Sequence, residues 1–323
     1  MQNEDLSRLA TLYYVDGLTQ EDLSQMFSIS RATVGRMLRR ALQEGIVEIR
    51  VRPSNTLSSD LEKALIARFG IKRALISVDH KDQDKQRALL AGLVASHLER
   101  ILTDGSVVAV GMGRNVSAVS EHAMPAARRQ CTFVSAIGGA YRGGQTMNAD
   151  HIARRLAARF GGESESLYAP ALVDDPLVRL KLIENDTVCH TLDKARRADI
   201  ALVGIGDMSE SEESNIVRMG WFSPAEIAQA KQAGTVGDVM GYDFIDIHGQ
   251  PSALAMQGRV IGLNLHELKQ IANVIAIASE PTKVSGILGA LNAGIIDTLA
   301  TTSSNALSVL SFDEALRRTA STS

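Results

Sequence analysis

The chain has 323 residues, of which 45% are hydrophobic and 22% are charged, and its formal net charge is −3. This length suggests about two folded domains, and no apolar stretch approaches the roughly 20 residues that a membrane-spanning helix needs. The composition therefore predicts a soluble protein. Cys131 and Cys189 are too few for a disulfide framework or a zinc site, and we expect both to be buried and reduced. Because Glu4 and Asp5 stand where a signal peptide would be basic, we expect the cytoplasm.

The first fifty residues carry the pattern of three short helices. Apolar side chains recur at helical spacing over residues 6–15, and Gly17 suits the left-handed position that ends such a helix. Thr19 is placed to cap a second helix, because Asp22 follows three residues later as in a capping box. A short turn then leads to Ser30, which we expect to cap a third helix.

The second and third of these helices have one apolar face and one polar face. The apolar positions, which we expect to be buried, are Leu23, Met26, Val34, Met37, Leu38 and Ala41. The outer face of the third helix is basic, because residues 31–40 hold four arginines and no acidic residue. This arrangement is typical of a helix-turn-helix, whose second helix enters the major groove of DNA. The alternative is an ordinary helical hairpin with a solvated basic face.

We therefore expect the third helix to contact double-stranded operator DNA. Arg31, Thr33 and Arg36 face outward near its start and are predicted to read bases, since arginine pairs with guanine through two hydrogen bonds. The remaining residues expected at the DNA are Thr19, Gln20, Ser28, Ser30, Ala32 and Arg40.

A wing and a linker are predicted to follow. Residues 45–51 alternate apolar and polar side chains, which predicts a strand with Arg50 and Arg52 close to phosphates. Residues 53–56 are turn formers, and a helix is expected over residues 57–69. The expected domains are a DNA-binding domain at 1–52, a linker at 53–57 and an effector-binding and oligomerisation domain at 58–319.

Beyond residue 70, apolar strand-like runs alternate with helical patterns. The expected strands are residues 74–78, 107–111, 132–137, 200–204, 274–279 and 298–301. The expected helices between them include residues 85–102, 148–160 and 283–293. Continuous apolar strands separated by helices indicate a mostly parallel sheet covered on both faces. The predicted fold class is α/β: an N-terminal all-α winged helix-turn-helix, then a Rossmann-like, mostly parallel α/β domain.

Several of these strands end in glycine-rich loops, and ligands bind where the carboxyl ends of parallel strands meet. The loops are Gly111-Met112-Gly113-Arg114-Asn115, Gly138-Gly139 and Gly204-Ile205-Gly206. Backbone N–H groups and a helix N-terminus after such a loop predict an anionic ligand, whereas the alternative is that the glycines only make tight turns. No nucleotide fingerprint is present: Val116 stands where G-x-G-x-x-G needs its third glycine, and G-x-x-x-x-G-K-[ST] is absent.

Taken together, these residues resemble the SorC family of sugar-responsive bacterial transcription regulators over nearly the whole chain. Further matching pieces are Tyr13-Tyr14-x-Asp16-Gly17-Leu18-Thr19-Gln20, Ala169-Pro170, Gly237-Asp238-x-x-Gly241-Tyr242 and the helix start near Lys283. The resemblance implies a sensor domain similar to sugar-phosphate isomerases and glucosamine-phosphate deaminases. Such a domain binds a phosphorylated sugar without converting it.

The resemblance also implies which residues hold the effector. The residues implied at the phosphate are Gly111, Met112, Gly113, Arg114 and Asn115, with backbone from Gly138 and Gly139. Asp238 would accept hydrogen bonds from sugar hydroxyls, and Lys283 would pair with the phosphate or a hydroxyl. Val116 stands where family members often carry threonine, so Arg114 is a candidate replacement donor for the anion.

The residues alone leave alternatives for two of these side chains. Asp238 follows a glycine in a turn-like setting, where aspartate often satisfies only its own backbone. Lys283 opens a helix, where a cation is unfavourable for the helix dipole. That placement indicates a partner for the lysine, and a solvated lysine is the alternative.

The competing function is catalysis by a sugar-phosphate isomerase-like or deaminase-like enzyme carrying a DNA-binding domain. Proton transfer on a sugar needs a carboxylate or histidine at the ligand, and residues 207–213 are acidic but hold no histidine. We expect no catalytic residue, metal or cofactor. A third interpretation, an architectural DNA-binding protein, leaves the glycine-ended strands unexplained. The expected protein represses a carbohydrate or polyol operon; its expected partners are operator DNA, a phosphorylated sugar or polyol and further copies of the chain in a dimer or tetramer, but no membrane.

Overall fold

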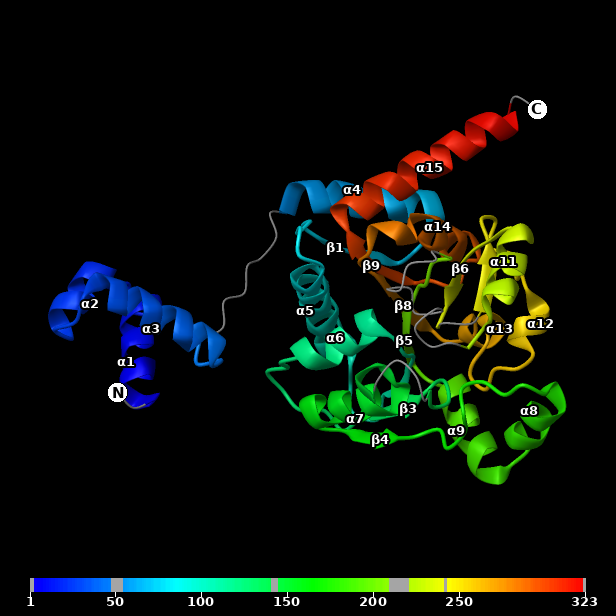
Figure 1. Ribbon diagram of the computed structural model, residues 1–323, viewed down its shortest axis with the longest axis horizontal. Helices are drawn as coiled ribbons and strands as arrows, with labels where there is room; N and C mark the ends of the chain where they lie inside the picture. The colour runs from blue at the N-terminus through cyan, green and yellow to red at the C-terminus, as the bar shows by residue number, and fades with distance from the viewer. Residues whose placement is uncertain (1–2, 48–54, 141–144, 209–220, 241–242, 322–323) are drawn as a thin grey trace. The chain divides into compact units, whose positions relative to one another are not determined.

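The computed structural model describes residues 3–47, 55–140, 145–208, 221–240 and 243–321 (Figure 1). The chain divides into two compact units: Met1–Pro53 is the N-terminal unit and Ser54–Ser323 is the large unit. Among the described residues, we find no helix with the length and apolar character needed to span a bilayer.

The described residues of the N-terminal unit form three helices: α1 (Asn3–Tyr14), α2 (Gln20–Met26) and α3 (Arg31–Gln43). The capping box predicted for α2 is present, because the Asp22 N–H donates to the Thr19 hydroxyl and the Thr19 N–H donates to the Asp22 carboxylate at 2.9 Å. Ser30 caps α3 by accepting from the Thr33 N–H. Gly17 has a φ of +75°, as expected for the residue that ends α1.

A small apolar core joins these three helices. It consists of Leu6, Leu9, Ala10, Leu23, Val34, Met37, Leu38 and Ala41. The expectation that Met26 faces this core was wrong: its side chain is 55% exposed, and Phe27 packs against the core in its place. Of the predicted wing strand, residues 45–47 are not in a strand. The rest of it, with Arg50 and Arg52, lies outside the described residues.

Seven parallel strands form the central sheet of the large unit. They are β1 (Arg73–Ser77), β2 (Val107–Val110), β3 (Thr132–Ser135), β4 (Glu163–Glu165), β5 (Ile200–Gly204), β8 (Asn273–Ala278) and β9 (Thr298–Thr302). Their order across the sheet is β1-β9-β8-β5-β2-β3-β4. Two further strands, β6 (Thr235–Val239) and β7 (Asp243–Asp246), form a separate antiparallel pair.

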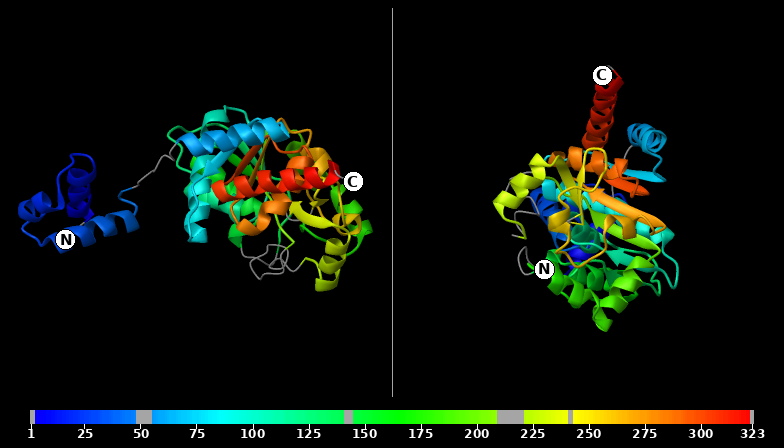
Figure 2. Two further views of the ribbon diagram at one scale, coloured as in Figure 1. Left: turned by 90° about the horizontal axis from the view of Figure 1, so that it is seen from above. Right: turned by 90° about the vertical axis from the view of Figure 1, so that its right-hand side faces the viewer.

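Helices cover both faces of this sheet (Figures 1 and 2). One layer consists of α5 (Gln83–Ile101), α6 (Arg114–His122) and α7 (Ala149–Phe160), and the other of α4 (Asn55–Phe69), α9 (Asp186–Arg196), α14 (Val284–Asn292) and α15 (Ser303–Ser321). Shorter helices are η1 (Gln145–Met147), α8 (Pro176–Ile183), α11 (Pro224–Gln232), α12 (Leu254–Gln257), α13 (Leu265–Leu268) and η2 (Pro281–Lys283). Successive residues of a strand pack against opposite helix layers, because side chains alternate between the two faces of a sheet. In β5, Ile200 and Leu202 pack into the first layer, and Ala201 and Val203 into the second.

The carboxyl ends of β2 and β5 are neighbours at the middle of the sheet. After β2 the chain continues to β3 on one side, whereas after β5 it reaches β8 on the other. In open α/β sheets, such a divergence leaves a crevice in which ligands bind. The inserted β6–β7 pair closes against the loop after β5: the Gly206 N–H donates to the Asp238 carbonyl at 2.9 Å, and the Met240 N–H to the Gly204 carbonyl at 3.0 Å.

The six predicted strands are all present, each within two residues of its expected bounds. The strands β4, β6 and β7 were not predicted, because none of them contains a long apolar run. Helix α4 begins at Asn55, two residues before its expected start. Cys131 is buried as expected, but Cys189, on α9, is only half-buried. Its thiol lies 3.7 Å from the Asp193 carboxylate.

Helices α4 and α15 lie side by side in the large unit (Figure 1). Two charged hydrogen bonds join them: Arg68 Nε and Nη2 donate to the two carboxylate oxygens of Asp313 at 2.5 Å and 2.6 Å. The Asp313 side chain is 9% exposed, so solvent screens this pair only weakly.

We expect Asp313→Ala to lower the free energy of unfolding by about 1.5–3 kcal/mol, because hydrogen bonds to charged groups contribute roughly that much. Urea denaturation followed by circular dichroism measures the change. The control is Glu314→Ala, which removes an exposed pair with Arg318 and should cost less than about 1 kcal/mol. Equal losses in the two variants would contradict the role assigned to Asp313.

Candidate functional site

A cleft opens in the large unit where the connections after β2 and β5 diverge. Its lining residues are Met112, Gly113, Arg114, Asn115, Gly204, Ile205, Gly206, Trp221, Asp238, Met240 and Lys283. The space measures about 420 Å³, part of it open to solvent. Separate chain segments therefore supply its walls: the start of α6, the loop after β5, the strand β6 and the turn η2.

The N-terminus of α6 lies at this cleft. Gly113 precedes the helix with a φ of +111° and provides no capping side chain for it. The first N–H groups of an α-helix have no intrahelical partner, and the dipole makes this end positive. Arg114, the first residue of α6, adds a cation at the same wall. This wall can therefore hold an anion such as a phosphate.

The strand β6 contributes a buried carboxylate. Asp238 is 1% exposed, and its side chain lies against the backbone of Gly206. Asp243, on the neighbouring strand β7, is 2% exposed. Burial raises the pKa of Asp243 to about 8; the carboxylates of Asp238 and Glu267 act in the same direction, and a hydrogen bond from the Leu265 N–H opposes them. Of these two buried carboxyl groups, Asp238 is the one that lines the cleft.

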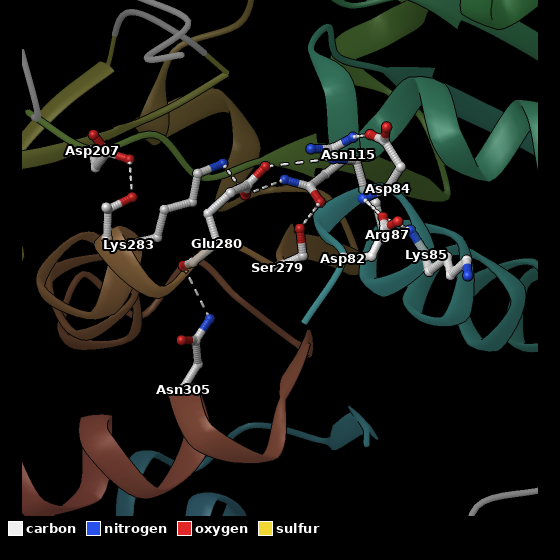
Figure 3. Close-up of polar contacts among 11 residues, drawn as sticks. Asp82, Asp84, Lys85, Arg87, Asn115, Asp207, Ser279, Glu280, Lys283 and Asn305 are labelled. Carbon is white, nitrogen blue, oxygen red and sulfur yellow. Dashed lines mark hydrogen bonds and ion pairs between the residues drawn. The ribbon is translucent and has the colours of Figure 1, made fainter. Parts of the chain in front are cut away.

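Lys283 lies at the cleft with a partner that the sequence did not reveal (Figure 3). Its Nζ is 2.9 Å from Glu280 Oε2, and both side chains are 7% exposed. The same oxygen accepts a hydrogen bond from Asn115 Nδ2 at 2.8 Å, while Asn115 Oδ1 accepts from Ser279 Oγ at 2.7 Å. Glu280 thus ties the turn η2 to the start of α6.

A second cation faces Glu280 from helix α5 (Figure 3). Arg87 Nε lies 3.5 Å from Glu280 Oε1, and Arg87 Nη1 donates to Asp84 at 2.6 Å. Although burial alone would raise the pKa of the Glu280 carboxyl, Lys283 and the hydrogen bond from Asn115 hold it well below its usual range. Glu280 is therefore an ionised carboxylate at neutral pH.

The effector residues expected from the sequence separate into two groups. Met112, Gly113, Arg114, Asn115, Asp238 and Lys283 all line the cleft, and Gly111 directly precedes this set. Gly138 and Gly139 are not part of the cleft lining; their N–H groups donate to the Ile261 and Ala169 carbonyls at 2.9 Å and 2.8 Å. The expectation that they supply backbone donors to the ligand does not fit this geometry, because those donors already bond to neighbouring segments.

The residues expected at DNA lie on α2, α3 and the turn between them. Arg31, Ala32, Arg36, Arg40, Thr19, Ser28 and Ser30 are exposed, and Gln20 and Thr33 are half-buried. The Thr33 hydroxyl lies 2.9 Å from the Ser30 hydroxyl and accepts from Arg36 Nη2 at 3.1 Å. Arg40 Nε donates to Glu44 at 2.6 Å. Arg31 and Arg36 thus lie at the outer surface of α3.

The sequence did not single out several residues that the fold brings to the cleft. Glu280 stands three residues before Lys283, so the unfavourable place of that lysine was a usable signal for its partner. Trp221 and Met240 carried no such signal. Met240 is buried with a φ of +60°, a conformation that non-glycine residues rarely adopt and that clusters at functional sites. The acidic residues 209–213 lie outside the described residues.

The family described as "Putative sugar-binding domain" matches residues 54–311. A crystal structure of the putative sugar-binding domain of a transcriptional repressor from Vibrio fischeri is 47% identical, covers 79% of this chain and 99% of that chain, and has a TM-score of 0.74. The full-length sorbitol operon regulator SorC from Klebsiella pneumoniae is 27% identical, covers 95% of this chain and 98% of that chain, and has a TM-score of 0.73. The transcriptional regulator LsrR from Enterobacter sp. (strain 638) is 28% identical over 96% of this chain and 93% of its own length.

The fold and these likenesses together define a class of protein. The chain is a DNA-binding transcription regulator, with an N-terminal helical unit and a sugar-binding domain. It belongs to the SorC family of sugar-responsive bacterial transcription regulators.

Gly206 offers a direct test of the cleft geometry. A Cβ atom at this position would lie 1.9 Å from Asp238 Oδ2 and 2.6 Å from its Cγ. We expect Gly206→Ala to lower the free energy of unfolding by about 1–3 kcal/mol, as overpacking does, and to displace Asp238. Gly92→Ala in α5 is the control, because nothing lies within 4 Å of its Cβ position and alanine favours a helix. A thermal melt in which both variants match the wild type would rule out this close packing.

Proposed function

We propose that the N-terminal unit binds operator DNA and that the cleft of the large unit binds a phosphorylated sugar or polyol, which controls DNA affinity. The observation that carries this proposal is the uncapped N-terminus of α6 at the crevice between β2 and β5. The relatives support repression of an operon for sugar or polyol use, since one is named as a repressor and another as the regulator of a sorbitol operon. The protein would then repress a carbohydrate or polyol operon in the cytoplasm.

The two walls of the cleft suit the two parts of such an effector. The phosphate would lie at the N-terminus of α6, where Arg114 and the N–H groups stabilise negative charge. Asp238, on β6, would accept hydrogen bonds from hydroxyl groups, because an ionised carboxylate is only an acceptor. Lys283 would pair with the phosphate or with a hydroxyl. An effector with both groups would contact both walls at once.

The N-terminal unit would read DNA through the start of α3. Arg31, Thr33 and Arg36 are proposed as base readers, with Thr19, Gln20, Ser28, Ser30, Ala32 and Arg40 at the backbone or in close approach. A helix-turn-helix of this kind works as a dimer on two half-sites, and we propose a dimer or tetramer of this chain. Effector binding would change the placement of the N-terminal units in the oligomer and so their fit to the operator.

Catalysis is the alternative that the proposal sets aside. Proton transfer at a sugar needs a group with a pKa near the working pH in reach of the ligand. Neither Glu280 nor Asp243 is among the lining residues. Glu280, which bonds to the lining residues Asn115 and Lys283, is held ionised by its partners, and the pKa of Asp243 is about 8. We therefore propose a sensor that binds its ligand without converting it.

Trp221 is the single tryptophan of the chain and lines the cleft, so its fluorescence should report occupancy. We expect a panel of sugar and polyol phosphates to contain a compound that shifts this fluorescence and raises the melting temperature. A ligand at 100 times its Kd stabilises the folded state by about 2.7 kcal/mol. Trp221→Phe should remove the fluorescence signal, and the matching unphosphorylated sugars should bind much more weakly. Turnover of the same compound by the purified protein would contradict a sensor.

Arg36→Ala tests base reading by α3. With an operator selected from random DNA, we expect the variant to lose about 1–3 kcal/mol of specific binding and much less on unrelated DNA. The comparison is Arg40→Ala, which should weaken both by a similar factor because a phosphate contact is independent of sequence. Fluorescence anisotropy measures the four affinities. If Arg36→Ala also lowers both affinities equally, Arg36 contacts phosphate.

A further inference from the structure

Glu280 is the shared acceptor of two donors that line the cleft. Lys283 Nζ and Asn115 Nδ2 both lie within 2.9 Å of the same oxygen, Oε2. The Asn305 amide additionally holds the Glu280 carbonyl at 3.2 Å, which fixes the backbone from which the carboxylate extends. Lys283 is therefore already neutralised by a buried, ionised side chain of the protein itself.

The other carboxylate oxygen of Glu280 has a looser partner. Arg87 Nε lies 3.5 Å from Oε1, close enough for an ion pair, yet neither atom has a hydrogen bond within the described part of the chain. The Arg87 side chain is 12% exposed, and its Nη1 is held by Asp84. Glu280 thus lies between a tightly bonded lysine at the cleft and an arginine that a small rotation would bring into bonding distance (Figure 3).

We propose that Glu280 is a competing anion that sets the effector specificity of the cleft, and that Arg87 is a positioning residue that receives Glu280 when an effector draws Lys283 away. An anionic group at the N-terminus of α6 competes with Glu280 for Lys283. Because several donors keep Glu280 ionised, protonation does not relieve this competition near neutral pH. Rotation towards Arg87 does, since the unpaired Oε1 and Nε then become hydrogen-bonded.

This exchange selects a class of ligand. A neutral sugar leaves the Lys283–Glu280 pair intact, because hydroxyl groups do not replace a buried carboxylate as the partner of an ammonium group. A phosphate dianion does replace it, since it brings two charges to the same lysine. The inference rests on the proposed function only in requiring that the natural effector carries an anionic group.

The test uses the full-length protein, inorganic phosphate as the probe, and both Trp221 fluorescence and the melting temperature as readouts. We expect Glu280→Gln to bind phosphate about tenfold more tightly than the wild type, because close charge pairs couple by at least this factor. The same variant should melt lower without phosphate, since Lys283 loses its buried partner, and should regain most of that loss when phosphate is added.

Arg87→Gln should have the opposite effect on phosphate binding. Without Arg87, Glu280 depends on Lys283 alone, so phosphate should bind several-fold more weakly, and Arg87→Lys should restore part of the affinity. The double variant with Glu280→Gln should match Glu280→Gln alone, because Arg87 acts only through Glu280. Lys85→Gln is the control: it removes an exposed cation from the same helix and should have little effect.

Each outcome decides between the possibilities. Unchanged or weaker phosphate binding by Glu280→Gln overturns the role of Glu280, provided that a sugar phosphate still binds the wild type. Additive effects in the double variant overturn the role of Arg87. If neither phosphate nor any sugar phosphate binds the wild type or any variant, the proposed function itself fails and this inference with it. Should Glu280→Gln not fold, the Arg87→Gln and Arg87→Lys pair decides by the same measurement.

Discussion

The divergence of the connections after β2 and β5 is the constraint on which the candidate site depends. Parallel strands place their carboxyl ends at one edge of the sheet. That edge is left uncovered only where the connections of two neighbouring strands run to opposite sides of the sheet. The chain must then turn sharply at both strand ends. Gly113, with its positive φ, makes one of these turns. The N-terminus of α6 consequently faces an open crevice rather than a packed core.

The β6–β7 insertion gives this crevice a second wall, which carries the carboxyl group of Asp238. Its approach is so close that glycine is required on each side: Cβ atoms at Gly206, Gly237 and Gly286 would each come within 2.7 Å of a neighbouring segment. This backbone contact carries Asp238 to the floor of the cleft. The pairing of β6 with β7 also places Asp238 and Asp243 on neighbouring strands. Burial, with the nearby Asp238 carboxylate acting in the same direction, raises the pKa of Asp243 to about 8.

The sequence predicted those features whose causes are local. Caps at Thr19 and Ser30 and the apolar runs of the central strands depend on neighbouring residues, so they could be read directly. Gly138 and Gly139 show the limit of this approach: they end a strand as the other loops do, but their donors bond to segments near Ala169 and Ile261. Arg87 could not have been predicted at the site, because only the finished fold brings α5 to the turn η2. Lys283 stands between these cases, since its unfavourable position indicated a partner.

The charged side chains around the cleft stabilise one another through hydrogen-bonded pairs. An unpaired ammonium or carboxylate inside a protein is costly, whereas a hydrogen-bonded pair is tolerated. Lys283 therefore depends on Glu280 as its buried partner, and Glu280 depends on several donors to remain charged. A ligand that entered such a network would exchange partners rather than supply missing ones, so its affinity would depend on the difference between two sets of contacts. Under the proposed exchange, specificity for an anion would follow from the carboxylate that the anion must displace, as much as from the cations that it meets.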